Sequence, residues 1–115
     1  MRALRAFHKT LADVNRLRIV QRLARAEASV TELIDHVGLS QPLVSWHVGK
    51  LRDAHLVATS RIGRETVCRL RADVLAEFVA RDRAILGLDW AHAAQHERPR
   101  NAQVPGNIQP EEAVS

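Results

Sequence analysis

The sequence predicts a mostly helical α+β fold with seven elements in the order ααααββα. Apolar residues recur at helical spacing in four segments of the first half and in one later segment. Two β-compatible runs, residues 56–61 and 65–70, lie between them and flank a glycine. Within residues 31–57, two short helices are separated by a tight turn. The pattern therefore places a helix–turn–helix directly before a β-hairpin.

The first two helices are defined by apolar spacing and by a capping residue. Regular spacing predicts a first helix over residues 2–11. Asp13 can cap a second helix, which we expect to end near Ala26. The apolar positions are Leu4, Phe7 and Leu11 in the first helix, and Leu17, Val20, Leu23 and Ala24 on one face of the second.

The third and fourth helices are short and carry their own start and stop signals. Thr31 is the expected cap of the third helix, and Gly38 its stop. Ser40 is the expected cap of the fourth helix, and Pro42 lies in its first turn, where a missing N–H is tolerated. The inward positions are Leu33, Ile34 and Val37 in the third helix, and Val44, Val48 and Leu51 in the fourth.

The hairpin and the last helix complete the fold. Ile62-Gly63-Arg64 joins the two strands, and Gly63 supplies the backbone freedom that a hairpin tip needs. Asp73 is the expected cap of a final helix that runs to about Trp90. The predicted fold is thus a winged helix–turn–helix. The apolar positions of the last helix are Val74, Leu75, Phe78, Val79, Ile85 and Leu86.

Length and charge indicate one small basic domain with a polar tail. The chain has 115 residues, and residues 97–115 contain three prolines and no apolar periodicity. We therefore expect a domain at 1–96 and a tail at 97–115. The formal charge is +4, and the tail holds two arginines and three glutamates, which leaves +5 on the domain. A basic domain suits a polyanion, although an arginine-rich surface without a partner is the alternative.

The cysteine count and the absence of long apolar runs indicate the cellular compartment in which we expect the protein. Cys68 is the only cysteine, so no internal disulfide forms and nothing implies an oxidising compartment. We expect it to be a small half-buried hydrophobe, with a redox-active thiol as the alternative. No apolar run is long enough for a bilayer and no secretory signal is recognisable, so we expect a soluble cytoplasmic protein without a membrane partner.

Several segments, in this order, resemble the ArsR/SmtB family of bacterial transcriptional repressors. The resemblance covers roughly residues 3–90 and implies a homodimeric repressor that a metal ion or another signal releases from its operator. The segments that carry the resemblance are Leu11-Ala12-Asp13, Arg16-Leu17-Arg18-Ile19-Val20, Leu39-Ser40-Gln41-Pro42, Val44-Ser45, His47-Val48, Leu51-Arg52 and Leu56-Val57.

The fourth helix is the expected reader of a DNA major groove, with the hairpin on the neighbouring backbone. Arg61 and Arg64 flank the hairpin tip and can reach phosphates or a minor groove, unless the hairpin is simply solvated. The candidate DNA contacts are Ser40, Gln41, Leu43, Ser45, Trp46, His47, Lys50, Arg61 and Arg64.

Some of these positions have a second interpretation. Trp46 stands where similar proteins carry a polar or basic residue, and it either faces DNA or folds back onto the protein. His47 matches the family's histidine but lies beside the buried stripe, so we expect a structural role, with contact to a base as the alternative. Gly49 is unusual inside a helix and indicates close approach to a duplex or a packing contact. We interpret His55 as a left-handed cap at the end of the helix.

Metal sensing, which the resemblance includes, has weak support. The third helix has no cysteine, and the family's last-helix zinc motif lacks its histidines here. Asp89, His92 and His96 share one face if the last helix continues, with Glu97 next and His8 as a further ligand, and such a set suits Zn, Ni or Co. The alternative is solvated histidines, and we expect no other cofactor.

The first and last helices are expected to pair across a two-fold axis, so that a homodimer reads a palindromic operator. The main prediction is therefore a DNA-binding transcriptional regulator whose effector the sequence does not identify. The alternatives are a metal-responsive sensor-repressor and a winged-helix protein-interaction module. No nucleophile–base pair, paired carboxylates or glycine-rich phosphate loop indicates an enzyme. The expected dimer contacts are Leu4, Phe7, Leu11, Leu75, Phe78, Val79 and Ile85.

Overall fold

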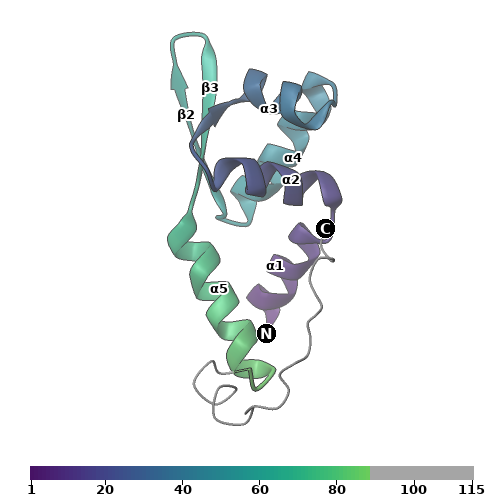
Figure 1. The fold of residues 1–115 in the computed structure, drawn as a ribbon, viewed down its shortest axis with the longest axis vertical. Helices are drawn as coiled ribbons and strands as arrows, with labels where there is room; N and C mark the ends of the chain where they lie inside the picture. Colours follow the sequence, from purple (N-terminus) through teal and green to yellow (C-terminus); the bar gives the residue numbers. More distant parts are fainter. Residues whose placement is uncertain (89–115) are drawn as a thin grey trace, which may run out of the picture. The chain divides into compact units, whose positions relative to one another are not determined.

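The computed structural model describes residues 1–88, which form five helices and three strands (Figure 1). The chain divides into two units, Met1–Ala80 and Arg81–Ser115, and the described part of the second is residues 81–88. The elements are α1 (Arg2–Leu11), α2 (Val14–Leu23), β1 (Ala28–Ser29), α3 (Val30–Val37), α4 (Gln41–Asp53), β2 (Val57–Ile62), β3 (Glu65–Leu70) and α5 (Ala72–Ile85).

The sheet contains one strand that was not predicted. β1 pairs Ala28 with Cys68 and Ser29 with Val67, which makes an antiparallel sheet in the order β1-β3-β2. The observed order is therefore ααβααββα, a correction to ααααββα. Two residues are too few to show the alternation that identifies a strand, and β1 forms only because β3 offers it a partner.

The β2–β3 hairpin has a tighter turn than predicted. Ile62 pairs with Glu65, so β2 continues one residue further and Gly63 and Arg64 alone form the turn. Gly63 has a φ of +62° at the first of the two turn positions, as in a type II′ turn. The turn places Arg64 at the tip of the wing.

The start of α2 follows the prediction, whereas its end comes earlier. The Asp13 carboxylate accepts hydrogen bonds from the backbone N–H groups of Asn15 at 2.8 Å and of Arg16 at 3.1 Å. α2 ends at Leu23 rather than Ala26. The chain must leave the helix there because it turns to reach β1 only a few residues later.

The start of α3 differs from the prediction by two residues. Ser29, not Thr31, is the cap, and its hydroxyl accepts a hydrogen bond from the N–H of Glu32 at 3.1 Å. The Glu32 carboxylate in turn accepts the N–H of Ser29 at 2.8 Å, which completes a capping box. Gly38, with a φ of +72°, ends the helix as predicted.

The last helix is shorter than predicted. α5 begins at Ala72, so Asp73 lies inside its first turn rather than at the cap, where a carboxylate still favours the helix dipole. The helix ends at Ile85. Trp90, its predicted end, lies outside the described residues.

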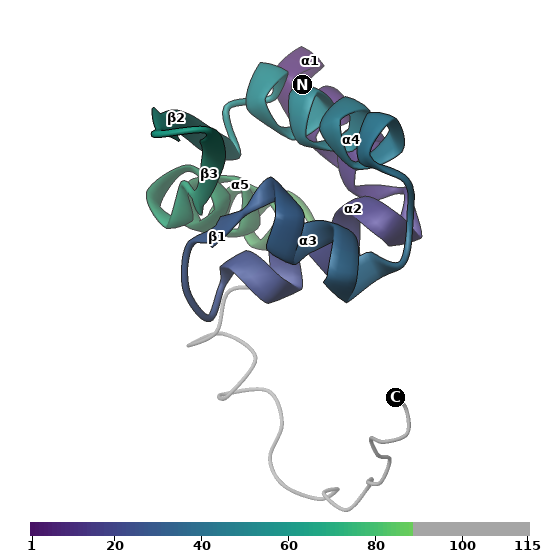
Figure 2. The same cartoon turned by 90° about the horizontal axis from the view of Figure 1, so that it is seen from above.

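The core lies where α2, α3 and α4 pack against one another, as Figure 2 shows. In α2 the core residues are Ile19 and the predicted Leu23, while Leu17 is 47% exposed, which corrects part of the predicted face. Ala24 is likewise exposed. Phe7 of α1 stacks on Phe78 of α5 with ring centroids 4.6 Å apart. The buried apolar side chains are Leu4, Phe7, Ile19, Leu23, Ala28, Leu33, Val37, Val44, Val48, Leu51, Leu56, Val57 and Cys68.

Cys68 is more deeply buried than predicted. Its side chain on β3 has no exposed surface, and burial raises the pKa of the thiol to about 11. A buried thiol with a raised pKa holds little thiolate at neutral pH, which disfavours the redox alternative. In this structure Cys68 is a packing residue of the sheet.

Candidate nucleic-acid interface

Helix α4 has a buried face and an exposed polar face, as predicted. Val44, Val48 and Leu51 point into the core. The exposed positions are Gln41, Pro42, Leu43, Ser45, Trp46, Lys50, Arg52 and Asp53.

The N-terminus of α4 lacks the predicted side-chain cap. Ser40 stands at the cap position with extended backbone, at φ −68° and ψ 159°, but its side chain makes no capping hydrogen bond. Pro42 lies in the first turn, and this turn contains no acidic residue. The positive end of the helix dipole is therefore not balanced by a carboxylate of its own first turn.

A polar hollow lies between α4 and the wing, and we call it the wing hollow. Gln41 and Ser45 enter it from α4, while Arg61 and Arg64 enter it from the hairpin. Arg61 also donates a hydrogen bond to the Thr66 hydroxyl across the hairpin at 3.3 Å. The structure thus brings four predicted DNA contacts together. The full lining is Val30, Thr31, Ile34, Gln41, Ser45, Arg61, Arg64, Glu65 and Thr66.

His47 is turned toward the protein. Only 5% of it is exposed, and its Nδ1 atom lies 3.1 Å from Nη1 of Arg16 on α2. A guanidinium can only donate, so this contact is a hydrogen bond in the tautomer in which Nδ1 accepts. Arg16 also donates from Nε to the carbonyl oxygen of Thr10 at 2.6 Å. This arrangement is the one that the expected structural role of His47 predicts.

Asp13 supports the same junction. Burial raises the pKa of its carboxyl group, but hydrogen bonds from the N–H groups of Arg16 and Asn15 outweigh burial and lower the pKa below its ordinary value. Electrostatic attraction to His47 and to Arg16 lowers the pKa further. A charged carboxylate therefore holds the start of α2, from which Arg16 reaches α4.

Trp46 is half exposed and lies among cations. Its side chain is 53% exposed, and Arg16 Cζ and Lys50 Nζ lie 5.6 Å and 5.3 Å from its ring centroid. The ring therefore contacts protein cations, as the packing alternative predicts, and still presents exposed surface, while contact with DNA stays a prediction. We call the depression that it lines the Trp46 hollow, formed by Lys9, Thr10, Arg16, Trp46 and Lys50.

Comparison with known proteins places this arrangement in a family. Residues 13–59 match the family described as "Bacterial regulatory protein, arsR family". The "HTH-type transcriptional regulator KmtR" of Mycobacterium tuberculosis is 35% identical over 104 residues, which are 88% of this chain and 74% of that protein. The chain belongs to the ArsR family.

Further relatives agree with this assignment. The "HTH-type transcriptional repressor SmtB" of Mycobacterium tuberculosis is 39% identical over 71 residues, 62% of this chain and 53% of that protein. The solved structure of an ArsR-like transcriptional regulator from Rhodococcus sp. RHA1 is 26% identical, with a TM-score of 0.66, and the match covers 81% of this chain and 87% of that one. This ArsR-family chain is a DNA-binding transcriptional regulator and not an enzyme.

The family match leaves parts of the interface outside it. It spans α2 to the first part of β2, and so contains Asp13, Arg16 and all of α4. The match does not include Lys9 of α1, or Arg61 and Arg64 of the wing. Sequence reasoning missed Lys9, Thr10 and Arg16, which line the Trp46 hollow, although a basic residue three positions after the cap of α2 was a usable signal.

The structure also bears on the predictions for Gly49 within α4 and for His55 just after its end. A Cβ atom added at Gly49 would meet only Arg52 Nη2, at an ordinary 3.7 Å, so no packing contact within the protomer requires a glycine. His55 has a φ of +64°, and its N–H donates to the carbonyl oxygen of Arg52 at 2.9 Å. The left-handed cap predicted for His55 is therefore confirmed.

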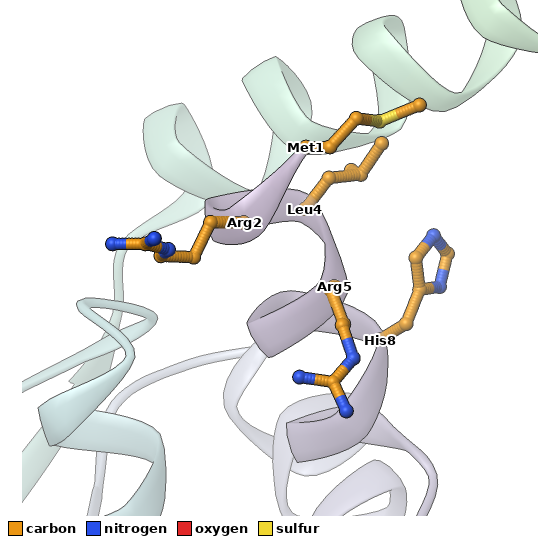
Figure 3. Close-up of a pocket in the computed structure, with 5 residues that line it drawn as sticks. All are labelled: Met1, Arg2, Leu4, Arg5 and His8. Carbon is orange, nitrogen blue, oxygen red and sulfur yellow. The ribbon is translucent and has the colours of Figure 1, made fainter.

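The predicted metal ligands lie almost entirely outside the described residues. Asp89, His92, His96 and Glu97 are beyond residue 88, and within residues 1–88 no three potential ligands lie close enough to hold a metal ion. His8 lies on α1, where it lines an apolar hollow with Met1, Leu4, Arg2 and Arg5 (Figure 3). No helix in the described part of the chain is long and apolar enough to cross a membrane.

Proposed function

We propose that this protein represses transcription by binding duplex DNA as a homodimer, with α4 in the major groove of each half-site. The observation that carries the proposal is the exposed polar face of α4, which is continuous with the arginines of the wing hollow. A helix about 10–12 Å wide fits the major groove, and an adjacent basic hairpin then meets the backbone. The +4 charge of the chain supports a polyanionic partner.

The exposed residues divide into two roles. Gln41 and Ser45 lie one helical turn apart and can read base edges, because an amide can bond in bidentate fashion to adenine and a hydroxyl to any base. Ser40 and the uncapped start of α4 suit a phosphate. Arg61 and Arg64 position the domain on the backbone. In this proposal His47 holds α4 against α2 through Arg16 rather than touching DNA.

We propose fewer dimer contacts than the sequence predicts. Leu4 and Phe7 are buried within one protomer, so a partner can gain little surface from them. Val79 and Ile85 are 41% and 51% exposed and remain available. A dimer would read two half-sites of a palindrome about one helical turn, or a multiple of it, apart. Such a repressor would act in the bacterial cytoplasm, where the operator is.

Selection of bound genomic fragments, followed by fluorescence anisotropy on the selected duplex, tests the proposal. A dimer with six to eight phosphate contacts should give a slope of roughly −5 to −7 in log affinity against log salt. Light scattering should give twice the mass of the chain. Strictly monomeric protein that ignores every duplex at low ionic strength contradicts the proposal.

Two alternative functions have separate tests. A sensor-repressor would bind Zn, Ni or Co through Asp89, His92 and His96, and isothermal titration should then show binding that His92→Ala removes. An interaction module would use the exposed Leu43 and Trp46 of α4, which are 48% and 53% exposed. That module predicts no salt-dependent binding to DNA, so the anisotropy experiment separates it from a repressor.

A further inference from the structure

We propose that the Trp46 hollow binds a DNA phosphate on the strand opposite to the one that the wing contacts. This inference rests on the proposed function and adds a second anchoring point to it. The C-terminal end of α1 and the start of α2 would then belong to the DNA-binding surface, together with α4 and the wing.

The charge of the hollow is the first argument. Lys9, Arg16 and Lys50 come from three different helices and line one depression. Neither lysine side chain makes a hydrogen bond or an ion pair within residues 1–88. No carboxylate is among the described residues that line the hollow, and that of Asp13, which interacts with Arg16, already accepts two backbone hydrogen bonds. Three cations without a carboxylate among them form a site for an anion.

The fixed position of Arg16 is the second argument. Its Nε atom bonds to Thr10 and its Nη1 atom to His47, so the guanidinium is held before any ligand arrives. Its Nη2 atom makes no hydrogen bond to another part of the described chain and can donate to a phosphate oxygen. The Thr10 hydroxyl donates to the carbonyl oxygen of Ala6 at 2.9 Å, so we assign it no donor role.

Trp46 gives the hollow an apolar wall. The ring lies within cation–π distance of both Arg16 and Lys50, which restrains these long side chains. Its exposed part can pack against the deoxyribose next to a bound phosphate. Such packing would give the exposed Trp46 ring of α4 a role in DNA binding.

The position of the two hollows on α4 selects the strand. Gln41 and Ser45 form one i, i+4 row and line the wing hollow, whereas Trp46 and Lys50 form the next row and line the Trp46 hollow. A major groove about 12 Å wide is bounded by the backbones of both strands. A helix that fills this groove therefore has one backbone on each side, and each hollow meets a different one.

A matched pair of double variants of the full chain tests this inference. The K9Q/K50Q variant removes two cations from the hollow, and R25Q/R69Q removes two exposed arginines elsewhere, in the loop after α2 and near the base of the hairpin. On a duplex selected by the wild type, we expect K9Q/K50Q to bind roughly ten-fold more weakly, with a salt slope reduced by about two for a dimer. Preference among base pairs should not change. The affinity of R25Q/R69Q for the same duplex should stay within about two-fold of that of the wild type.

Neutral methylphosphonate linkages, introduced one at a time, then locate the phosphate. We expect one linkage per half-site that weakens the wild type but causes no further loss in K9Q/K50Q. A second linkage should weaken the wild type but cause no further loss in Arg64→Gln, because Arg64 contacts that phosphate. The two linkages should lie on opposite strands. The inference is wrong if K9Q/K50Q matches R25Q/R69Q, or if both linkages lie on one strand.

The outcomes separate this inference from the proposed function. If the wild type binds DNA and Arg64→Gln weakens it while K9Q/K50Q does not, only the second anchoring point fails. If the wild type binds no duplex, both fail. Circular dichroism should show native helix content in both double variants, because all four substituted side chains are exposed.

Discussion

The N-termini of α3 and α4 start from the same residue in nearly the same conformation and use it differently. Ser29 and Ser40 both stand at the cap with extended backbone, at ψ 161° and 159°. The Ser29 hydroxyl accepts a hydrogen bond within a complete capping box, whereas Ser40 makes no side-chain cap bond. The third residue of α3 is Glu32, which reciprocates, while that of α4 is the apolar Leu43.

This difference indicates what each helix is for. The start of α3 satisfies its own N–H groups, so it contributes to stability. The start of α4 has no side-chain cap bond, and in the proposed function its free hydrogen-bonding capacity and its dipole serve a DNA phosphate. We therefore expect substitutions at the start of α3 to change folding, and substitutions on the exposed side of α4 to change DNA binding.

The largest expected effect is on base discrimination by α4. Gln41→Ala should relax the preference at one base pair by ~1–3 kcal/mol, because an amide that reads a base edge is lost. Arg64→Ala, in contrast, should weaken binding to all sequences alike. Competition anisotropy with single base-pair changes measures both. Unchanged sequence preference in Gln41→Ala would mean that another row of α4 faces the bases.

The next effect separates the two serines. Ser29→Ala should lower the free energy of unfolding by about 1 kcal/mol, because the N–H of Glu32 loses its acceptor. Ser40→Ala should change stability by less than about 0.5 kcal/mol, since no cap bond is lost, and should weaken DNA binding. Urea denaturation and anisotropy of both variants give the comparison. Equal losses of stability would show that Ser40 caps α4 in solution.

A smaller gain in stability is expected in the middle of α4. Gly49→Ala should raise the free energy of unfolding by about 0.5–1 kcal/mol, because alanine favours a helix and the added Cβ meets no close contact. If the glycine allows close approach to DNA, the same variant should bind the selected duplex more weakly. Ala54→Gly, just past the end of the helix, serves as a control for the flexibility of this segment. Unimpaired binding by Gly49→Ala would leave the glycine without a role in DNA contact.

The smallest effect concerns pH and is confined to α3. The hydrogen bond from the N–H of Ser29 lowers the pKa of Glu32 below its ordinary value. The ionised Glu32 carboxylate therefore contributes fully to the free energy of unfolding above its unfolded-state pKa. This contribution is lost as the pH falls through the lower folded-state pKa. Glu32→Gln, which keeps an acceptor oxygen, should make the acid side of the stability–pH curve shallower. Urea denaturation between about pH 5 and pH 3 measures this change, and an identical slope in wild type and variant would contradict it.

Local signals were sufficient for most of the fold and for the reading helix. The limits of α1, the capping of α2 by Asp13 and the glycine that ends α3 depend on residues at most a few positions apart. The buried stripe of α4 and its exposed polar face follow in the same way from helical periodicity. The left-handed His55 was likewise recognisable from its place after the helix.

Only the tertiary structure decided the remaining features, because each depends on partners distant in the chain. β1 forms only through pairing with β3, some 40 residues later, and this pairing also moves the α3 cap from Thr31 to Ser29. Ile19 replaces Leu17 in the core because α3 and α4 pack on that side of α2. The bond from Arg16 to His47, across 31 positions, joins α2 to α4 and creates the Trp46 hollow. Periodicity determines which residues share a helix face, but packing determines what that face meets.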